Sequence, residues 1–207
     1  AYYSKGTGIF TKIADTVLVG GAVANVFLKA QGRTIRDSFI EDVFVDKVKR
    51  EKKDWVEDAK NILKQAEPLS KKIITPTDLV ISDGNSTKII NISTEEIPAG
   101  WMALDIGPQT QKEYSLIINK SKTVFLNGPM GKFEDKRFAP GSEAIFTAMK
   151  DVSKNLSGET ILAGGDTIDI ASKYGSLNDY SHVSLAGGAT LEFLTGKELP
   201  ALLPLIE

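Results

Sequence analysis

The chain of 207 residues contains four places where a short apolar stretch runs into glycines and then into a helix-forming stretch. Glycine has no side chain and tolerates positive φ, so a ligand can lie against the main chain there. The helix that follows points its free amides and the positive end of its dipole at the same place, which is where phosphate binds. If the strands are parallel neighbours, all four clusters lie along one edge of one sheet. The pattern therefore predicts a nucleotide- or phosphate-binding protein; the segments are Thr16–Asn25, Val124–Glu134, Ile161–Ala171 and His182–Leu194.

Charge and cysteine content narrow the setting. The formal net charge is −2, so the chain as a whole has no attraction to nucleic acid or to an anionic membrane, and phosphate binding must be local. Cysteine is absent, which excludes a disulfide framework and a thiolate nucleophile. No apolar run approaches the roughly 20 residues that cross a bilayer. We expect a cytoplasmic protein without nucleic-acid or membrane partners.

The order of the expected elements predicts the fold class. From Trp101 onward strands and helices alternate, which is typical of parallel βαβ units. We therefore predict an α/β fold, a three-layer α/β/α Rossmann-like domain with a mainly parallel sheet, and a single domain over residues 1–207. The expected strands are Thr16–Val19, Lys72–Thr75, Leu79–Ser82, Lys88–Ile92, Met102–Ile106, Thr123–Asn127, Thr160–Ala163 and Val183–Ala186. The expected helices are Thr7–Ile13, a helix ending near Gln31, a long charged region over Ser38–Glu67, Gln109–Ser121, Phe138–Asn155, Thr167–Tyr174 and Ala189–Thr195.

Common nucleotide-binding motifs are missing from the sequence. No G-x-x-x-x-G-K-[ST] segment occurs, and no strand opens into G-x-G-x-x-G, which disfavours a P-loop NTPase and a dinucleotide dehydrogenase. No H-R-D or D-F-G segment occurs, which excludes a protein kinase.

The glycine clusters and their flanks closely resemble the C-terminal, nucleotide-binding domain of phosphoglycerate kinase. The resemblance covers almost the whole chain, in the family's order. It is carried by KIADTVLVGGAVANVFLKAQG, GWMALDIGPQT, FLNGPMGKFE, AGGDT and SHVSLAGGATLEFLTGKELP.

The resemblance implies phosphate transfer between 1,3-bisphosphoglycerate or 3-phosphoglycerate and ADP or ATP, with Mg²⁺. In that family an N-terminal domain holds the phosphoglycerate, and nothing in this chain corresponds to it. We interpret the chain as the nucleotide-binding half of a monomeric glycolytic kinase, inactive on its own. A noncatalytic nucleotide-binding module, or pseudo-kinase, on the same scaffold is the alternative.

Asp166 has two readings. It precedes an expected helix, where Asp is among the best N-cap residues, and a carboxylate is also a preferred ligand of Mg²⁺ beside nucleotide oxygens. On its own the residue favours the cap; the AGGDT resemblance favours the metal. The nucleotide phosphates would then be held by Thr167 and the amides of Gly164, Gly165 and Thr167.

Further roles follow from the resemblance. Glu134 would accept hydrogen bonds from the ribose hydroxyls, and the backbone amides of Gly165, Gly187 and Gly188 would stabilise charge on the transferring phosphoryl group. The turn under the phosphate chain would be Asn127, Gly128 and Pro129, and the apolar slot for adenine would be Gly20, Gly21, Ala103 and Leu104, with Phe39 as a further candidate.

The chain departs from the family at its lysines. Two lysines of a G-G-A-K-V-S-D-K segment bind phosphate in the family, and an ungapped match puts Tyr2 and Gly6 at their positions. Lys5 or Lys132 is a candidate replacement. Losing both cations would leave transition-state charge poorly neutralised, which favours the pseudo-kinase alternative. Glycines of the family are replaced at Ala103, Ala163 and Ala186, where each methyl could narrow the nucleotide slot.

Overall fold

A computed structural model describes residues 13–40, 43–46, 51–67, 72–194, 196 and 199, with the backbone alone described at 43–46 and 51–53. These residues divide into two compact units. The first comprises the chain up to Tyr114 together with Met130–Ser142, and the second comprises Ser115–Pro129 together with the chain from Glu143 onward. The expected helix at 7–13, apart from its last residue, and the sites at Tyr2, Lys5 and Gly6 lie outside the described residues.

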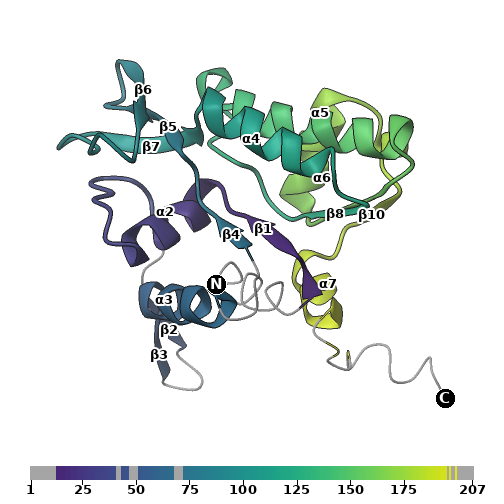
Figure 1. The fold of residues 1–207 in the computed structure, drawn as a ribbon, viewed down its shortest axis with the longest axis horizontal. Helices are drawn as coiled ribbons and strands as arrows, with labels where there is room; N and C mark the ends of the chain where they lie inside the picture. Colours follow the sequence, from purple (N-terminus) through teal and green to yellow (C-terminus); the bar gives the residue numbers. More distant parts are fainter. Residues whose placement is uncertain are drawn as a thin grey trace. The chain divides into compact units, whose positions relative to one another are not determined.

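The first unit opens with a strand, a glycine turn and a helix, as predicted. Strand β1 (Thr16–Leu18) leads through Gly20 into α2 (Gly21–Ala30), and Gly32 with its φ of 83° follows the end of that helix. β1 pairs in parallel with β4 (Lys72–Ile74), and α2 packs against α3 (Trp55–Ala66; Figure 1). Their shared apolar core is built from Val19, Ala24, Val26, Phe27, Trp55, Ala59 and Ile62.

The long helix predicted over Ser38–Glu67 is wrong in its first half. The described backbone there is an antiparallel hairpin of β2 (Val43–Asp46) and β3 (Glu51–Asp54), and only α3 is helical. The segment Val-Phe-Val at 43–45 has the β-branched and aromatic residues that favour a strand. Asp54 then starts the helix, because its carboxylate accepts the amides of Val56 and Glu57, each at 3.0 Å.

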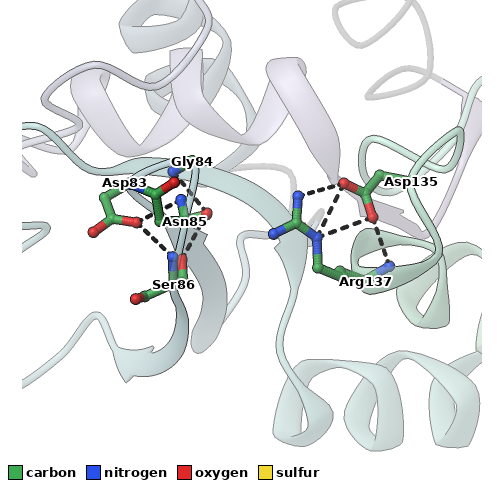
Figure 2. Close-up of polar contacts among 7 residues, drawn as sticks. Asp83, Gly84, Asn85, Ser86, Asp135 and Arg137 are labelled. Atoms are coloured by element: carbon green, nitrogen blue, oxygen red, sulfur yellow. Dashed lines mark hydrogen bonds and ion pairs between the residues drawn. The ribbon is translucent and has the colours of Figure 1, made fainter.

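A three-stranded antiparallel sheet follows in the first unit. Strand β5 (Asp78–Ser82) pairs with β6 (Thr87–Asn91) on one side and with β7 (Met102–Ile106) on the other. The turn between β5 and β6 is closed by Asp83, whose carboxylate accepts the amides of Asn85 at 2.9 Å and Ser86 at 2.7 Å (Figure 2). The strand at Met102–Ile106 is confirmed, but its pairing corrects the expectation that parallel βαβ units begin there.

The second unit contains the predicted parallel βαβ units. Its sheet has the order β10-β9-β8, and both pairings are parallel. The apolar core includes Phe146, Met149, Val152, Leu162 and Ile170, all fully buried. The strands are β8 (Thr123–Leu126), β9 (Glu159–Ala163) and β10 (His182–Ser184), and the helices are α6 (Gly165–Tyr174), α7 (Gly187–Leu194) and α5 (Pro140–Asn155) from Glu143 onward (Figure 1). The first three residues of α5 belong to the first unit. The other described elements are α4 (Pro108–Ile118), η2 (Lys136–Phe138) and η3 (Leu177–Asp179).

The α/β fold class is thus confirmed, and the expectation of one shared sheet edge holds for three of the four glycine clusters. Those three follow β8, β9 and β10, whereas the first follows β1, whose hydrogen bonds go to β4. None of the described helices combines the length and apolarity needed to span a membrane.

Candidate functional site

Three strand-end turns of the second unit are joined by hydrogen bonds. The Asn127 side-chain amide, after β8, donates to the carbonyl oxygen of Ala163 at the end of β9 (2.6 Å). The amide of Gly164 donates to the carbonyl of Ser184 at the end of β10 (3.0 Å). These bonds bring together the glycine clusters that the sequence predicts at one sheet edge.

The glycines of these turns are required by close approach. Gly164 has a φ of 97°, and a Cβ on it would lie 2.9 Å from the side-chain nitrogen of Asn127. A Cβ on Gly187 would lie 3.2 Å from the Cα of Gly164. A side chain on Gly164 would be strained by this φ and would meet the Asn127 side chain, and one on Gly187 would press on the Gly164 backbone, so glycine lets the two helix starts lie this close.

The start of α6 presents amides and one carboxylate. Gly164 is the N-cap residue and α6 begins at Gly165, so the amides of Gly165, Asp166 and Thr167 are those that a helix leaves without an internal partner. Asp166 therefore lies inside the first turn, and its reading as the N-cap residue is wrong. Its side chain is exposed, and among the described residues nothing forms a hydrogen bond or ion pair with its carboxylate.

The other predicted residues of this unit differ in accessibility. Thr167 is only 1% exposed, and its hydroxyl oxygen accepts the amide of Gly128 at 2.7 Å, so it ties the β8 turn to α6. Gly128 itself has a φ of 94°, and Pro129 is half-buried. Gly187 and Gly188 open α7, whose Thr190 amide returns to the carbonyl of Ala186. The described residues contain no group of three or more metal-ligating side chains.

The first unit carries the remaining predicted residues. Gly20 is buried against Met130, and the amide of Gly21 donates to the Met130 carbonyl at 2.8 Å. A side chain on Gly20 would collide with Met130. The glycine turn after β1 is thus fixed to the segment that contains Glu134.

Strand β7 is irregular at Leu104. Val80 pairs with Asp105 and Ile81 with Ala103, so Leu104 forms a β-bulge without a partner on β5. Its carbonyl oxygen instead accepts the amide of Lys132 at 2.7 Å. Such bulges are over-represented beside active sites, where they redirect one group out of the ladder.

Two further residues lie near these elements. The amide of Ala103 donates to the buried hydroxyl of Ser38 (2.8 Å), and Phe39 beside it is 68% exposed. Its carbonyl oxygen accepts the side-chain amide of the buried Asn25 (2.9 Å). These two hydrogen bonds fix the backbone at residues 38–39, from which the side chain of Phe39 is exposed.

Glu134 is exposed, and the next residue, Asp135, forms an ion pair with Arg137. The Asp135 carboxylate accepts the backbone amide and two guanidinium nitrogens of Arg137 (Figure 2). Hydrogen bonds from the Arg137 side chain lower the pKa of Asp135 to about 2. This ion pair fixes the turn after Glu134 and occupies Arg137, while Lys132 nearby stays an exposed cation.

Two buried residues were missed by sequence reasoning. Asp105 is 3% exposed, and its carboxylate accepts the amides of Gly141 (2.7 Å) and Ile106 (2.9 Å). The hydroxyl of the fully buried Tyr114 lies 2.9 Å from the carbonyl oxygen of Val19, just before Gly20. Burial raises the pKa of Asp105 to about 7. The sequence offered one signal for Asp105, because it is a charged residue inside the apolar run Met102–Ile106. No sequence feature marked Tyr114 as buried.

Asp105 predicts a pH dependence of stability. Its pKa is higher in the folded chain than the ordinary 3.8, so between about pH 4 and pH 7 the folded chain holds a proton that the unfolded chain has lost. Asp105 therefore contributes up to roughly 4 kcal/mol to the free energy of unfolding below pH 4. This contribution is lost as the pH rises to about 7. We expect urea unfolding to show that the free energy of unfolding falls more between pH 5 and pH 8 in the wild type than in Asp105→Asn. Equal losses would contradict the assignment.

Comparison with known proteins gives consistent matches. The family model for phosphoglycerate kinase matches residues 8–197. The phosphoglycerate kinase of Pelotomaculum thermopropionicum is 37% identical over 201 residues, covering 96% of this chain and 47% of the relative. That of Chloroherpeton thalassium is 42% identical over 192 residues, covering 91% and 45%. The solved phosphoglycerate kinase of Coxiella burnetii has a TM-score of 0.80 at 29% identity and covers 97% of this chain and 48% of its own. The chain spans about half the length of these relatives.

Proposed function

The chain belongs to the phosphoglycerate kinase family, and from this we propose that it is the nucleotide-binding half of such a kinase. The complete protein would transfer phosphate between 1,3-bisphosphoglycerate and ADP, or between ATP and 3-phosphoglycerate. The phosphoglycerate would be held by a part of the protein outside this chain. We expect residues 1–207 to act as a single nucleotide-binding domain of a monomeric cytoplasmic enzyme, with no nucleic-acid or membrane partner.

The observation that carries this proposal is the joined set of turns in the second unit. Gly164 and Gly187 let the starts of α6 and α7 approach each other closely, and the first turns of both helices supply amides without a partner inside the helix. Phosphoryl transfer needs little covalent work from side chains and depends on such positioned donors. We assign phosphate binding to the amides at Gly164, Gly165 and Thr167, of which the Gly164 amide would have to exchange its hydrogen bond to Ser184 for one to phosphate. We assign stabilisation of the transferring group to Gly165, Gly187 and Gly188.

Asn127, Gly128 and Pro129 would form the turn beneath the phosphates. The side chain of Asn127 already donates to the carbonyl of Ala163, and the hydroxyl of Thr167 accepts the amide of Gly128. Both side chains therefore also stabilise the turns.

In the first unit, the proposed adenosine contacts share one network. Gly20 and Gly21 are held by Met130, and Leu104 holds Lys132, two residues before Glu134. The exposed carboxylate of Glu134 would accept from ribose hydroxyls, and Ala103 and Leu104, both half-buried, would offer apolar contacts to adenine. Phe39 is exposed enough to contribute a further apolar surface.

Magnesium fits the exposed carboxylate of Asp166. Mg²⁺ prefers one or two carboxylates together with nucleotide oxygens and water, and so does not need a cluster of protein ligands. Asp166 is exposed in the first turn of α6, beside the amides assigned to phosphate. Bound there, the ion would neutralise phosphate charge.

Asp166→Asn tests this assignment. The substitution removes a negative ligand without changing the N-cap, which is Gly164. We expect affinity for Mg-ADP to fall about tenfold, about 1.4 kcal/mol, while affinity for metal-free ADP stays equal or improves because a repelling charge is lost. Calorimetry at matched free magnesium measures both; equal Mg-ADP affinities in the two proteins would remove Asp166 from the metal site.

The proposed function itself is tested by titrating the chain with Mg-ADP. We expect binding in the micromolar-to-millimolar range, about −8 to −4 kcal/mol, because water still reaches the phosphates and the two family lysines are replaced. No heat and no thermal shift at several millimolar Mg-ADP would contradict it.

A noncatalytic nucleotide-binding module is the second candidate, favoured by Tyr2 and Gly6 at the family's lysine positions. The rest of the protein separates the two. A cluster of arginines with a histidine, suited to a phosphoglycerate, would support the kinase, and its absence would support the pseudo-kinase.

A further inference from the structure

Asp105 is the buried charged residue around which the first unit's proposed adenosine contacts are arranged. Its carboxylate accepts the amide of Gly141, the second residue of α5, at 2.7 Å, and so caps that helix from a distant strand. Pro140 before it has no amide, which suits the first helical position. Among the residues that the structure describes, no cation pairs with this carboxylate, and hydrogen bonds from the backbone hold it.

The segment that leads to Glu134 lies directly on this carboxylate. A Cβ on Gly131 would come within 2.5 Å of the Asp105 Oδ1 and equally close to the carbonyl oxygen of Leu104. The next residue, Lys132, donates its amide to Leu104 at 2.7 Å. Backbone and carboxylate are therefore in contact, and the place of this segment on β7 depends on what occupies position 105.

The start of α5 extends the network to the glycine turn after β1. Ser142, 1% exposed, accepts the amide of Met130 at 3.0 Å. Met130 in turn accepts the amide of Gly21 at 2.8 Å. Hydrogen bonds thus run from Asp105 through the start of α5 and Met130 to Gly21.

We propose that Asp105 is a positioning residue for nucleotide binding. By holding Gly141 and supporting Gly131, its carboxylate fixes Leu104, the segment leading to Glu134 and the Gly20–Gly21 turn in one arrangement. The side chain is buried, so it acts through these backbone segments and does not touch the nucleotide. This inference rests on the proposed function, because those segments matter for binding only if they hold adenosine.

The chain offers a matched control at Asp78. This carboxylate is also buried, and it caps α4 as Asp105 caps α5, accepting the amides of Gln109 (3.0 Å) and Thr110 (2.7 Å). Neither Gln109 nor Thr110 belongs to the proposed nucleotide contacts. Asp78→Asn therefore disturbs a buried capping carboxylate of the same kind at a place where nucleotide affinity should not depend on it.

The experiment compares Asp105→Asn, Asp78→Asn and Ser142→Ala with the wild type at pH 8. In Asp105→Asn an amide nitrogen replaces one accepting oxygen and faces a backbone donor. We expect ADP affinity to fall about tenfold in Asp105→Asn and about threefold in Ser142→Ala, as for lost or opposed buried hydrogen bonds. The ADP affinity of Asp78→Asn should stay within about twofold of the wild-type value, even if the Tm falls by a similar amount in both aspartate variants.

Hydrogen exchange of the nucleotide-free chain gives a second readout. The amides of Lys132 and Gly21 should exchange at least about tenfold faster in Asp105→Asn than in the wild type or Asp78→Asn. Equal loss of ADP affinity in the two aspartate variants, or unchanged exchange at Lys132 and Gly21, would overturn the positioning role. A wild-type chain that binds no ADP would overturn the proposed function instead, and the exchange result would still decide whether Asp105 holds these segments.

Discussion

Given Mg-ATP and 3-phosphoglycerate, the chain alone is expected to transfer phosphate at less than about a thousandth of the roughly 1–100 per second usual for kinases. In-line transfer requires both reactants held within near-attack distance, and that positioning supplies about 7–11 kcal/mol of the barrier lowering. The amides of α6 and α7 would position the nucleotide only. Nothing in the proposed assignments holds the acceptor, so the loss should appear in the rate at saturating nucleotide.

A coupled assay with ADP binding measured on the same sample tests this. Binding without turnover is the expected combination, and adding the other half of the protein as a separate polypeptide should raise the rate. Turnover in the ordinary range by the chain alone would show that the phosphoglycerate site lies within it.

The second large effect is expected for Gly164→Ala. With a φ of 97° and a ψ of 145°, Gly164 occupies a region that other residues enter at a cost of about 1–3 kcal/mol. The new methyl would also displace the side-chain nitrogen of Asn127, only 2.9 Å away, from its bond to Ala163. We expect a total loss of about 3 kcal/mol, a fall in Tm of roughly 6–12 °C and loss of measurable Mg-ADP binding.

Gly165→Ala is the matched control for stability. Gly165 is the first residue of α6, and a Cβ on it would meet nothing within 4 Å. We expect Tm to stay equal or rise, because alanine is favoured over glycine in helices by up to about 1 kcal/mol. Similar losses of Tm in both variants would mean that the backbone conformation of Gly164 is not what requires glycine.

The parts that the sequence predicted are those with a local signal. Glycines after apolar runs marked β8, β9 and β10 and the starts of α6 and α7, and the expected strands Leu79–Ser82 and Lys88–Ile92 lie on either side of the Asp83 turn. The hairpin β2–β3 was missed because the apolar residues around it also fit a helical period, and Asp54 was not recognised as a helix start. Helical periodicity over a charged region is a weak signal when a good N-cap residue lies within it.

The network around Asp105 could not be predicted from local patterns. Its hydrogen bond to Gly141 joins residues 36 positions apart, and its contact with Gly131 depends on a β-bulge that no sequence period reveals. The hydrogen bond between Met130 and Ser142 also joins residues that are 12 positions apart. Their roles follow from tertiary packing, which single-sequence reasoning does not supply.

At the bulge, strand pairing and the attachment of the proposed site depend on different residues. Ala103 and Asp105 already pair with consecutive residues of β5, so the ladder is complete without the residue between them. Leu104 is in effect an insertion in the strand, and its carbonyl is used by Lys132 instead of by the sheet. A shortened chain lacking this one residue could keep its strand register while losing the attachment of the segment before Glu134, so foldability and ligand recognition would be under separate selection at adjacent positions.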